Sequence, residues 1–508
     1  MKPVYARWLL ATLLFSPVAR AMDLPQPVLD ALHHARIPVS SVGVVVRELG
    51  AEKPLIQVNA ARPMSPASTM KLLTTYAALE LLGPAYSWKT EAWLDGQLEN
   101  GVLHGNLIIK GYGDPKITVE QFWMWLHDLR NRGLREITGD LVLDRSAFAA
   151  EEIDPGAFDN DPSRAYNVGP DALLLNFNAI RLRFMPSGDS RVNVTTEPAL
   201  AGYTLDDRVV RRGRHNCADW DDNIQVRLQG DAIQVRGDYP LNCGEHDKPF
   251  SLLPHSRYFD AVFRDVWQEV GGRLHGGTHE GVKPAGATLL STHYSQPLTE
   301  LIRDINKFSN NVMARQLFLS LGANNGGPAP SMDQPETQPG AEAASAVPAQ
   351  PFAQADASAA LDGLIHPAVP ASIARSTQAI RSWLAHKGLS FPELVLENGA
   401  GLSRKERISP LSMSLLLQSV QQSPLSAEVE ASLPIVGVDG TMRRRLDNCP
   451  ATSHAHLKSG SLEGVKSIAG YVNSRTGKQW ITVFLINHAN AAAGQRAQDA
   501  LVEWLEQQ

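Results

Sequence analysis

Residues 65–82 read SPASTMKLLTTYAALELL, and they carry the clearest chemical signal in the chain. Ser65-Pro66 leads into a helical pattern, and Ser68 and Lys71 stand three positions apart at its start. Residues three apart share one face of a helix, so the amine of Lys71 can reach the hydroxyl of Ser68. A buried or cation-crowded lysine loses its proton more easily and can act as a base, which makes the serine oxygen a nucleophile. Backbone N–H groups at the same helix start could stabilise an oxyanion.

The same residues allow a simpler interpretation, in which the serine caps the helix and the lysine is solvated. A Ser-x-x-Lys pair arises by chance about once in a chain of this composition. Two further motifs favour catalysis. Ser309-Asn310-Asn311 opens another amphipathic helical segment and offers a hydroxyl and a carboxamide. Lys458-Ser459-Gly460 lies in a strand-like segment, where the glycine permits close approach of a substrate backbone and the lysine can hold a carboxylate.

Strand patterns at the two ends of the chain predict one domain assembled from both ends, with the middle as an insertion. An amphipathic helix at about 494–505 follows the last strand. From about residue 90 to 289, short strands with turn residues fit one or two small β-rich units. The terminal strands are a hairpin at 41–47 and 54–58 and a second pair at 467–472 and 480–486.

The three motifs, in this order, resemble those of the penicillin-recognising serine enzymes, whose acyl-enzyme chemistry uses Ser-x-x-Lys, Ser-x-Asn and Lys-Thr/Ser-Gly. Ser309 follows Ser68 by 241 positions. This spacing resembles that of the low-molecular-mass class C penicillin-binding proteins, the D-alanyl-D-alanine carboxypeptidase/endopeptidase family. In that family, extra domains are inserted between the first two motifs. The other segments that resemble this family are 113–115 (GDP), 143–146 (LDRS), 166–167 (YN), 175–178 (LNFN), 399–404 (GAGLSR) and 433–441 (LPIVGVDGT).

The resemblance implies an α+β fold. Its catalytic domain would be β-lactamase/transpeptidase-like, an antiparallel sheet flanked by helices, with β-rich domains inserted into it. The expected divisions are 22–90 and 290–508 for the catalytic domain, 91–165 and 241–289 for the inserted domain, and 166–240 for a nested β-rich domain.

The resemblance also implies roles for the motif residues. Ser68 would attack the carbonyl between two D-amino acids, with Lys71 as its base. Ser309 and Lys458 would relay a proton to the leaving amine, while Asn311 would hold the acyl amide. Water would then release the acyl group.

The substrate-binding groups follow in the same way. Lys458 and the hydroxyl of Ser459 would recognise the terminal carboxylate, beside Gly460. The backbone N–H groups of Ser68 and Ser461 would form the oxyanion hole. Ser459 replaces the usual threonine but keeps its hydroxyl, so little loss is expected.

In the family, an acid, an aromatic, an arginine and a residue after Lys-Thr-Gly build a pocket for the diaminopimelate side chain. The resemblance places these at Asp144, Phe148, Arg404 and Glu463. Glu463 replaces a commonly amide side chain, and its charge could favour an amine-bearing substrate or shift the pH optimum. Ordinary turn and surface placement is the alternative for Asp144, Phe148 and Glu463.

Composition and charge exclude several classes of protein. The 508 residues are 43% hydrophobic and 20% charged, which is unlike a collagen, a disulfide-stapled miniprotein or a wholly disordered chain. Lys and Arg number 47 against 53 Asp and Glu. The chain therefore lacks the overall positive charge that would favour nucleic-acid binding. The Ala-, Pro-, Gln- and Ser-rich stretch at about 322–370 lacks aliphatic anchors and is expected to be disordered.

The N-terminus predicts export. Residues 1–21 have a basic start, a short apolar run and small residues before a cleavage point, as a secretory signal peptide does. The expected location is the periplasm, with no more than weak membrane association, and a homodimer stays open. The expected partners are peptidoglycan peptides of the diaminopimelate type, with β-lactams as covalent inhibitors and no nucleic acid.

Export makes a disulfide permissible. Cys217 and Cys243 flank a short strand-like stretch and are the expected pair, which leaves Cys449 unpaired. A catalytic thiol is the weaker interpretation, because no cysteine lies at a helix start or beside a base. The histidines form no metal-binding motif, so neither a metal nor another cofactor is expected.

Three functions therefore compete. The motifs and export favour a periplasmic serine D,D-carboxypeptidase and endopeptidase that acts on peptidoglycan. A β-lactamase or esterase would use the same chemistry with fast deacylation. A non-catalytic wall-binding protein would use the inserted β-rich domains alone.

Overall fold

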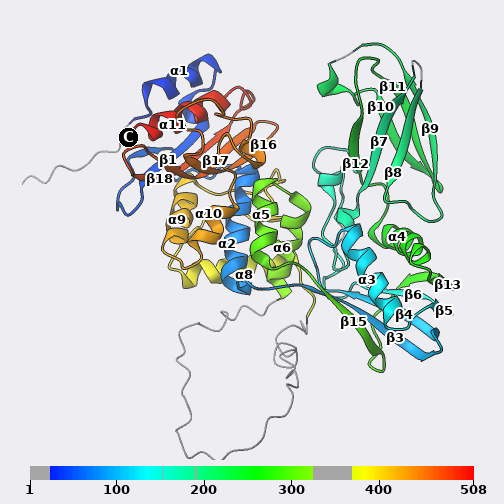
Figure 1. The fold of residues 1–508 in the computed structure, drawn as a ribbon. Helices are drawn as coiled ribbons and strands as arrows, with labels where there is room; N and C mark the ends of the chain where they lie inside the picture. The colour runs from blue at the N-terminus through cyan, green and yellow to red at the C-terminus, as the bar shows by residue number, and fades with distance from the viewer. Residues whose placement is uncertain (1–22, 152, 189–190, 215, 324–368) are drawn as a thin grey trace, which may run out of the picture.

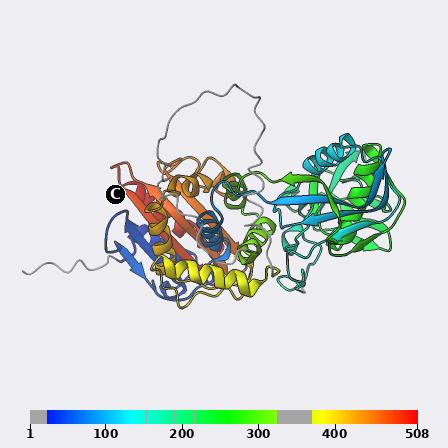
Figure 2. The ribbon, with the colours of Figure 1, turned by 90° about the horizontal axis from the view of Figure 1, so that it is seen from below.

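The computed structural model describes residues 23–151, 153–188, 191–214, 216–323 and 369–508 (Figure 1). Two lobes lie side by side, and Figure 2 shows that only a narrow waist joins them. The predicted signal peptide at 1–21 and nearly all of the predicted 322–370 loop lie outside the described residues.

The first lobe is built on a five-stranded sheet in the order β16-β17-β18-β1-β2, antiparallel throughout. Val42 of β1 pairs with Ile486 of β18, so the two ends of the chain meet in one sheet as predicted. The strands are β1 (Val42–Glu48), β2 (Ile56–Val58), β16 (Ala455–Leu462), β17 (Val465–Asn473) and β18 (Gln479–Asn487).

Helices cover both faces of this sheet. Alternate residues of β18 enter different cores: Phe484 and Ile486 pack beneath the terminal helices, whereas Val483 and Leu485 pack beneath a helical subdomain. The terminal helices are α1 (Gln26–His34) and α11 (Gln495–Glu506). The subdomain contains α2 (Lys71–Leu82), α5 (Leu298–Lys307), α6 (Asn311–Ala323), α8 (Ile373–His386), α9 (Pro410–Gln421) and α10 (Ser426–Ser432).

The second lobe leaves the first after α2 and returns before α5. Its lower part is a seven-stranded mixed sheet, with helices α3 (Val119–Asn131) and α4 (His255–Glu269) packed on it. The strands are β3 (Lys89–Glu99), β4 (Val102–Gly111), β5 (Glu136–Ile137), β6 (Leu141–Asp144), β13 (Arg273–Leu274), β14 (Thr278–Glu280) and β15 (Thr288–Tyr294).

The upper part of the second lobe is a six-stranded sheet in the order β10-β11-β9-β8-β7-β12. Cys217 and Cys243 form the predicted disulfide beside it, with Cα atoms 5.5 Å apart, and Cys449 is free. The strands are β7 (Ile180–Ser187), β8 (Arg191–Glu197), β9 (Thr204–Arg211), β10 (Ile224–Gln229), β11 (Ala232–Tyr239) and β12 (His246–Phe250).

Two of the predicted domain boundaries do not coincide with the ends of these sheets. β12 pairs with β7, so the nested unit extends past residue 240 to 250. β15 pairs with β3, so the inserted sheet runs past 289 to 294. Local patterns reveal a strand but not its hydrogen-bonding partner, and the partner decides to which domain the strand belongs.

Candidate active site

Ser68 lies where the five-stranded sheet meets the helical subdomain. A 3₁₀ turn, Ala67–Met70, carries it and runs directly into α2. Ala67 has a φ of 47°, and Gly401 packs so closely on it that a Cβ at Gly401 would lie 1.8 Å from the Ala67 carbonyl oxygen. Glycine is therefore required at 401, and this contact holds the backbone beside the serine.

Lys71 is fully buried one turn further along. Its Nζ lies 3.1 Å from Ser68 Oγ and 2.7 Å from Asn311 Oδ1, and it also donates to the Ala400 carbonyl. Burial and the nearby charge of Lys458 hold the pKa of Lys71 well below that of a free lysine. The lowered pKa makes the neutral amine, which can accept the Ser68 proton, easier to reach. The geometry places this serine–lysine pair as its spacing predicted.

Glu406 organises the loop that supplies the Ala400 carbonyl. This carboxylate is fully buried, and its two oxygens accept the backbone N–H groups of four loop residues at 2.8–3.0 Å. The donors are Glu397, Asn398, Gly399 and Gly401. Its negative charge also raises the pKa of Lys71, against the larger lowering effects. Glu406 was not predicted from the sequence, because a glutamate between Lys405 and Arg407 gives no local sign of burial.

A second serine–lysine pair faces the first. Ser309 lies in the turn between α5 and α6 with a φ of 57°, and its Oγ accepts from Lys458 Nζ at 2.9 Å. Lys458 projects from β16 and is buried, which lowers its pKa to about 7. Each lysine thus has one hydroxyl within hydrogen-bonding distance, and the pKa of each is lowered by burial.

The edge strand β16 presses against the backbone of Ser68. A Cβ on Gly460 would lie 2.8 Å from the Ser68 nitrogen, so only glycine fits there. Ser461 follows, which leaves the backbone N–H groups of Ser68 and Ser461 as the candidate oxyanion donors. Beyond them, the hydroxyls of Ser459 and Thr441 lie 2.7 Å apart and offer a hydrogen-bonding pair to a carboxylate.

These groups line a cavity of about 740 Å³ between the lobes. Arg404 stands at one end, where its Nη2 lies 3.2 Å from Glu463 Oε2 and its guanidinium carbon lies 4.7 Å from the centre of the Phe158 ring. The structure therefore brings together Ser68, Ser309, Asn311, Ser459, Gly460, Ser461, Arg404 and Glu463 as cavity-lining residues, with Lys71 and Lys458 directly behind them.

Asp144 and Phe148 are not part of this cavity, which corrects the sequence-based placement. Asp144 is buried at the end of β6, where it accepts from Lys110 Nζ at 3.0 Å. Phe148 packs against Tyr112 in a separate small core. The second lobe instead contributes an acid, Asp159, and an adjacent aromatic, Phe158, to the cavity lining. They lie on an irregular segment without periodicity, so only its packing on the first lobe brings them there.

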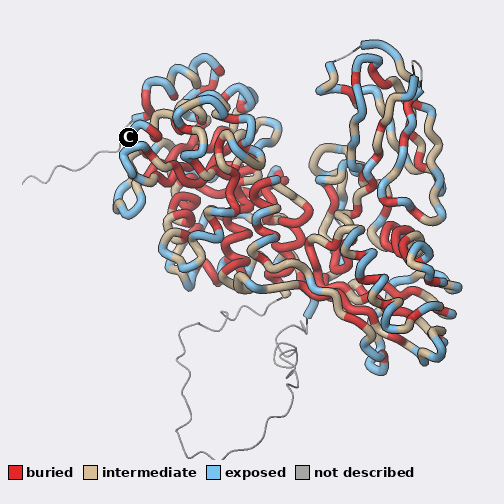
Figure 3. The backbone as a smooth tube through the Cα atoms, in the orientation of Figure 1, coloured by how far each residue is buried: buried red, intermediate tan, exposed pale blue. Residues whose placement is uncertain are grey.

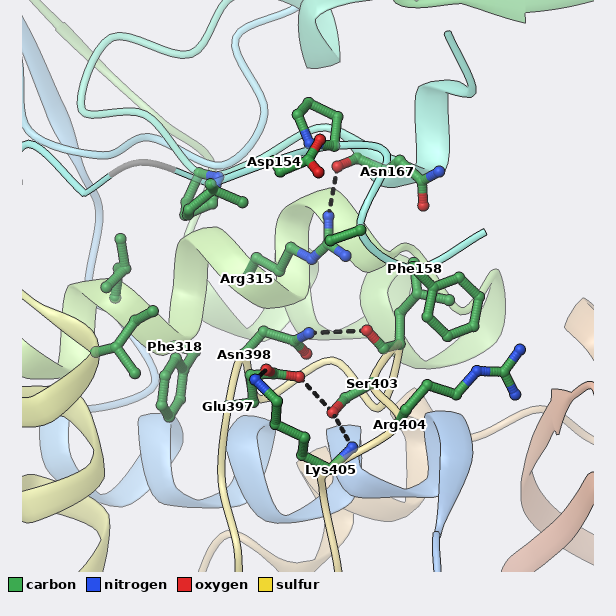
Figure 4. A pocket seen from close by; sticks show the side chains of 17 residues that line it. Asp154, Phe158, Asn167, Arg315, Phe318, Glu397, Asn398, Ser403, Arg404 and Lys405 are labelled. Atoms are coloured by element: carbon green, nitrogen blue, oxygen red, sulfur yellow. Dashed lines mark hydrogen bonds and ion pairs between the residues drawn. The ribbon is translucent and has the colours of Figure 1, made fainter. Parts of the chain in front are cut away.

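A smaller cavity of about 330 Å³ adjoins Arg404 (Figure 4). Arg315 of α6 reaches across it and donates from Nη1 to the carbonyls of Asn167 and Val168, both at 2.8 Å. Burial lowers the pKa of Arg315 to about 10. This arginine ties the helix that begins at Asn311 to the inserted lobe.

Among the described residues, no group of three or more His, Cys, Asp or Glu side chains is arranged to hold a metal ion. The cavity itself presents hydroxyls, buried amines and backbone N–H groups. A serine hydrogen-bonded to a buried lysine, backbone N–H groups beside a β-strand edge and a second serine–lysine pair are features of the penicillin-recognising, transpeptidase-like serine hydrolases.

Comparison with known proteins gives the same class. The model of the D-Ala-D-Ala carboxypeptidase 3 (S13) family matches residues 24–337 and 364–508. The chain belongs to this family, the class C low-molecular-mass penicillin-binding proteins.

Individual relatives match over most of their length. The D-alanyl-D-alanine carboxypeptidase DacB of Haemophilus influenzae is 26% identical over 464 residues, which are 88% of this chain and 85% of that protein. A D-alanyl-D-alanine carboxypeptidase of Actinomadura sp. is 26% identical over 501 residues, covering 93% and 83%. The crystal structure of penicillin binding protein 4 from Haemophilus influenzae shares the fold, with a TM-score of 0.73 and 24% identity over 95% of this chain and 99% of that one.

Proposed function

We propose that the protein is a serine D-alanyl-D-alanine carboxypeptidase and D,D-endopeptidase that acts on peptidoglycan peptides of the diaminopimelate type through an acyl-enzyme on Ser68. The observation that carries the proposal is the 3.1 Å contact between Ser68 Oγ and the buried Nζ of Lys71. The family to which the chain belongs supports the same reaction.

In the first step, the neutral amine of Lys71 takes the proton of Ser68 as the serine oxygen bonds to the carbonyl carbon of the penultimate residue. The carbonyl electron pair moves to the oxygen, which accepts from the backbone N–H groups of Ser68 and Ser461. Asn311 holds the acyl amide. The product of this step is a tetrahedral intermediate.

Collapse of the intermediate restores the carbonyl and breaks the bond to the leaving nitrogen. That nitrogen takes a proton from the Ser309 hydroxyl, and Lys458 returns a proton to Ser309 across their 2.9 Å hydrogen bond. With a pKa of about 7, Lys458 can give and regain this proton near neutral pH. Water then attacks the ester carbonyl carbon, and the proton it gives up restores Lys458 through Ser309. The bond between the acyl carbon and Ser68 Oγ breaks as Lys71 returns its proton to that oxygen, which releases the acyl group as a carboxylic acid.

Substrate recognition would use the two ends of the cavity. Ser459 and Thr441 would bind the terminal carboxylate, and Lys458 adds a positive charge there. At the other end, Arg404 and Glu463 would hold the diaminopimelate side chain, with Phe158 against its methylenes. Glu463 favours a side chain that ends in an amine.

β-Lactams would acylate the same serine. A structure of the Haemophilus influenzae relative is described as complexed with a β-lactam, which supports this part of the proposal. A β-lactamase or esterase is the second candidate and would release such an adduct quickly.

The proposed location is the periplasm, which residues 1–21 support as a signal peptide. No helix of the described chain has the length and apolar character that a membrane crossing needs.

Mass spectrometry tests the proposal in two assays. Benzylpenicillin should add its mass to the peptide that contains Ser68, and the adduct should persist for many minutes. Purified muropeptides should lose D-alanine, and cross-linked dimers should yield monomers. Rapid loss of the adduct without muropeptide turnover would favour the β-lactamase alternative, and a protein that forms no adduct and cleaves nothing would favour a wall-binding role.

A further inference from the structure

A second hollow begins at Ser309, on the side away from Arg404. It encloses about 650 Å³, and it lies between the α5–α6 turn of the first lobe and strand β12 of the nested sheet. The two cavities adjoin, because four residues line both: Arg164, Tyr166, Ser309 and Asn311. We call this hollow the outer groove and define its walls by Phe308, Tyr166, Lys248 and Phe250.

Hydrogen bonds hold together the wall of the outer groove that the second lobe contributes. Arg164 pairs with Phe250 in a β-bridge, and the Ser251 N–H donates to the Ser163 carbonyl at 2.8 Å. Tyr166 Oη donates to Asp159 Oδ2 at 2.7 Å. The edge strand of the nested sheet is thereby joined through the 161–166 segment to the rim of the catalytic cavity.

The facing wall carries an unusual residue for a protein surface. Phe308 immediately precedes Ser309, and 68% of its surface is exposed. Tyr166, across the groove, is 40% exposed. Covering exposed aromatic rings is favourable and gives geometric specificity, so two of them beside a reactive serine indicate a ligand that lies between the lobes.

Reaction chemistry identifies that ligand. The leaving nitrogen must come within hydrogen-bonding distance of Ser309 Oγ to receive its proton, so whatever is attached to the nitrogen continues past Ser309. A single D-alanine would fill little of the outer groove, whose volume is that of sites for much larger ligands. Lys248 and Arg164 provide positive charge for the carboxylates of a peptide, although Lys248 also pairs with Asp221 and Arg164 with Asp159.

We propose that the outer groove binds the second peptide strand of a cross-linked substrate, the strand that carries the leaving amine. The nested domain then acts in substrate selection, because β12 forms one wall of the groove. This inference rests on the proposed function, and it distinguishes cleavage of a cross-link from removal of a terminal D-alanine.

Two variants test the groove on its two walls, Phe308→Ala and Lys248→Ala. Each is assayed with a monomeric pentapeptide, by release of D-alanine, and with a purified cross-linked muropeptide dimer. We expect cleavage of the dimer to fall at least about tenfold, since aromatic anchors contribute most to peptide binding. Release of D-alanine from the monomer should stay within about twofold of the wild-type rate, because a single D-alanine fills little of the groove.

Arg236→Ala is the matched control. Arg236 also lies in the nested sheet and pairs with an aspartate, Asp206, but it does not line the groove. It should leave both rates unchanged. Dimer cleavage at the wild-type rate in both groove variants would overturn the proposal, as would a parallel fall of both activities in Lys248→Ala, which is remote from Ser309 in the sequence. Wild-type protein that neither binds penicillin nor releases D-alanine would instead refute the proposed function.

Discussion

The catalytic centre and the nested sheet use charged residues in opposite ways. Lys71, Lys458 and Glu406 are fully buried, whereas the nested sheet carries its charges on the surface, as in the Arg183–Glu245 pair with side chains 42% and 58% exposed. In Figure 3, buried backbone is concentrated inside the first lobe, whereas the nested strands alternate between buried, intermediate and exposed residues. Burial alters the protonation of a group, while an exposed pair contributes little. Charged groups whose protonation burial alters are therefore concentrated in the first lobe, whereas the charges of the nested sheet stay in contact with solvent.

The largest effect that follows from this contrast is expected at Ser68. Ser68→Ala removes the nucleophile, so acylation by penicillin and release of D-alanine should fall at least about 1,000-fold. Stopped-flow acylation and muropeptide assays measure this loss. The melting temperature should stay close to that of the wild type, and a variant that released D-alanine at the wild-type rate would refute the mechanism.

The second prediction concerns Asp114, a carboxyl whose burial should make the folding stability depend on pH. Its carboxyl is buried in the segment that follows β4, and burial raises its pKa to about 7. The folded protein therefore binds a proton there that the unfolded chain releases above about pH 4, so stability is lost as the pH rises from about 4 to 7.

The Asp114→Asn substitution removes the titrating carboxyl, so this loss of folding stability with rising pH should disappear. At pH 8 the variant should be more stable than the wild type, by up to about 4 kcal/mol, and below pH 4 the gain should vanish. Thermal unfolding across this pH range measures the difference. A gain that is the same at every pH would show that the carboxyl does not titrate in this range.

The third prediction asks whether the buried charge of Glu406 influences the reaction through Lys71, which it does not contact directly. Glu406→Gln replaces one acceptor oxygen by a donor, so the loop that presents the Ala400 carbonyl to Lys71 is held less well. We expect penicillin acylation to slow about tenfold. The acid limb of its pH–rate profile should move to lower pH, because loss of the negative charge lowers the pKa of Lys71 further.

Glu393→Gln is the control for Glu406. Glu393 accepts from the Ser409 N–H and the Ser412 hydroxyl in a neighbouring turn, without contact to the loop at Ala400. Its variant should change stability without moving the pH profile. Identical profiles for both variants and the wild type would assign Glu406 a purely structural role.

The smallest effect is expected on the nested sheet. Arg183→Ala removes a surface pair whose nitrogen and oxygen are 3.5 Å apart and solvent-exposed. The free energy of unfolding should change by less than about 0.5 kcal/mol, and penicillin acylation should not change. Chemical denaturation checks the first expectation, and a change above about 2 kcal/mol would contradict the contrast between the two regions.

The sequence predicted which candidate catalytic groups the structure brings together, because each motif places its residues on one local element. Ser68 and Lys71 share the start of a helix, and Lys458 and Gly460 share an edge strand. The split architecture was also predictable, since hydrophobic alternation marks the strands at both ends of the chain. The hydrogen-bonding partners of the strands were not predictable. For that reason the domains to which β12 and β15 belong had to be corrected.

The sequence by itself therefore determined the chemistry and the core of the first lobe, through short spacings and periodic burial. Tertiary structure alone decided what surrounds that chemistry. It brought Phe158 and Asp159 to the cavity in place of Phe148 and Asp144, buried Glu406 beneath the loop beside Lys71, and opened the outer groove along β12. Each of these features arises where irregular segments from distant parts of the chain pack together, and such packing leaves no local pattern in the residues that form it.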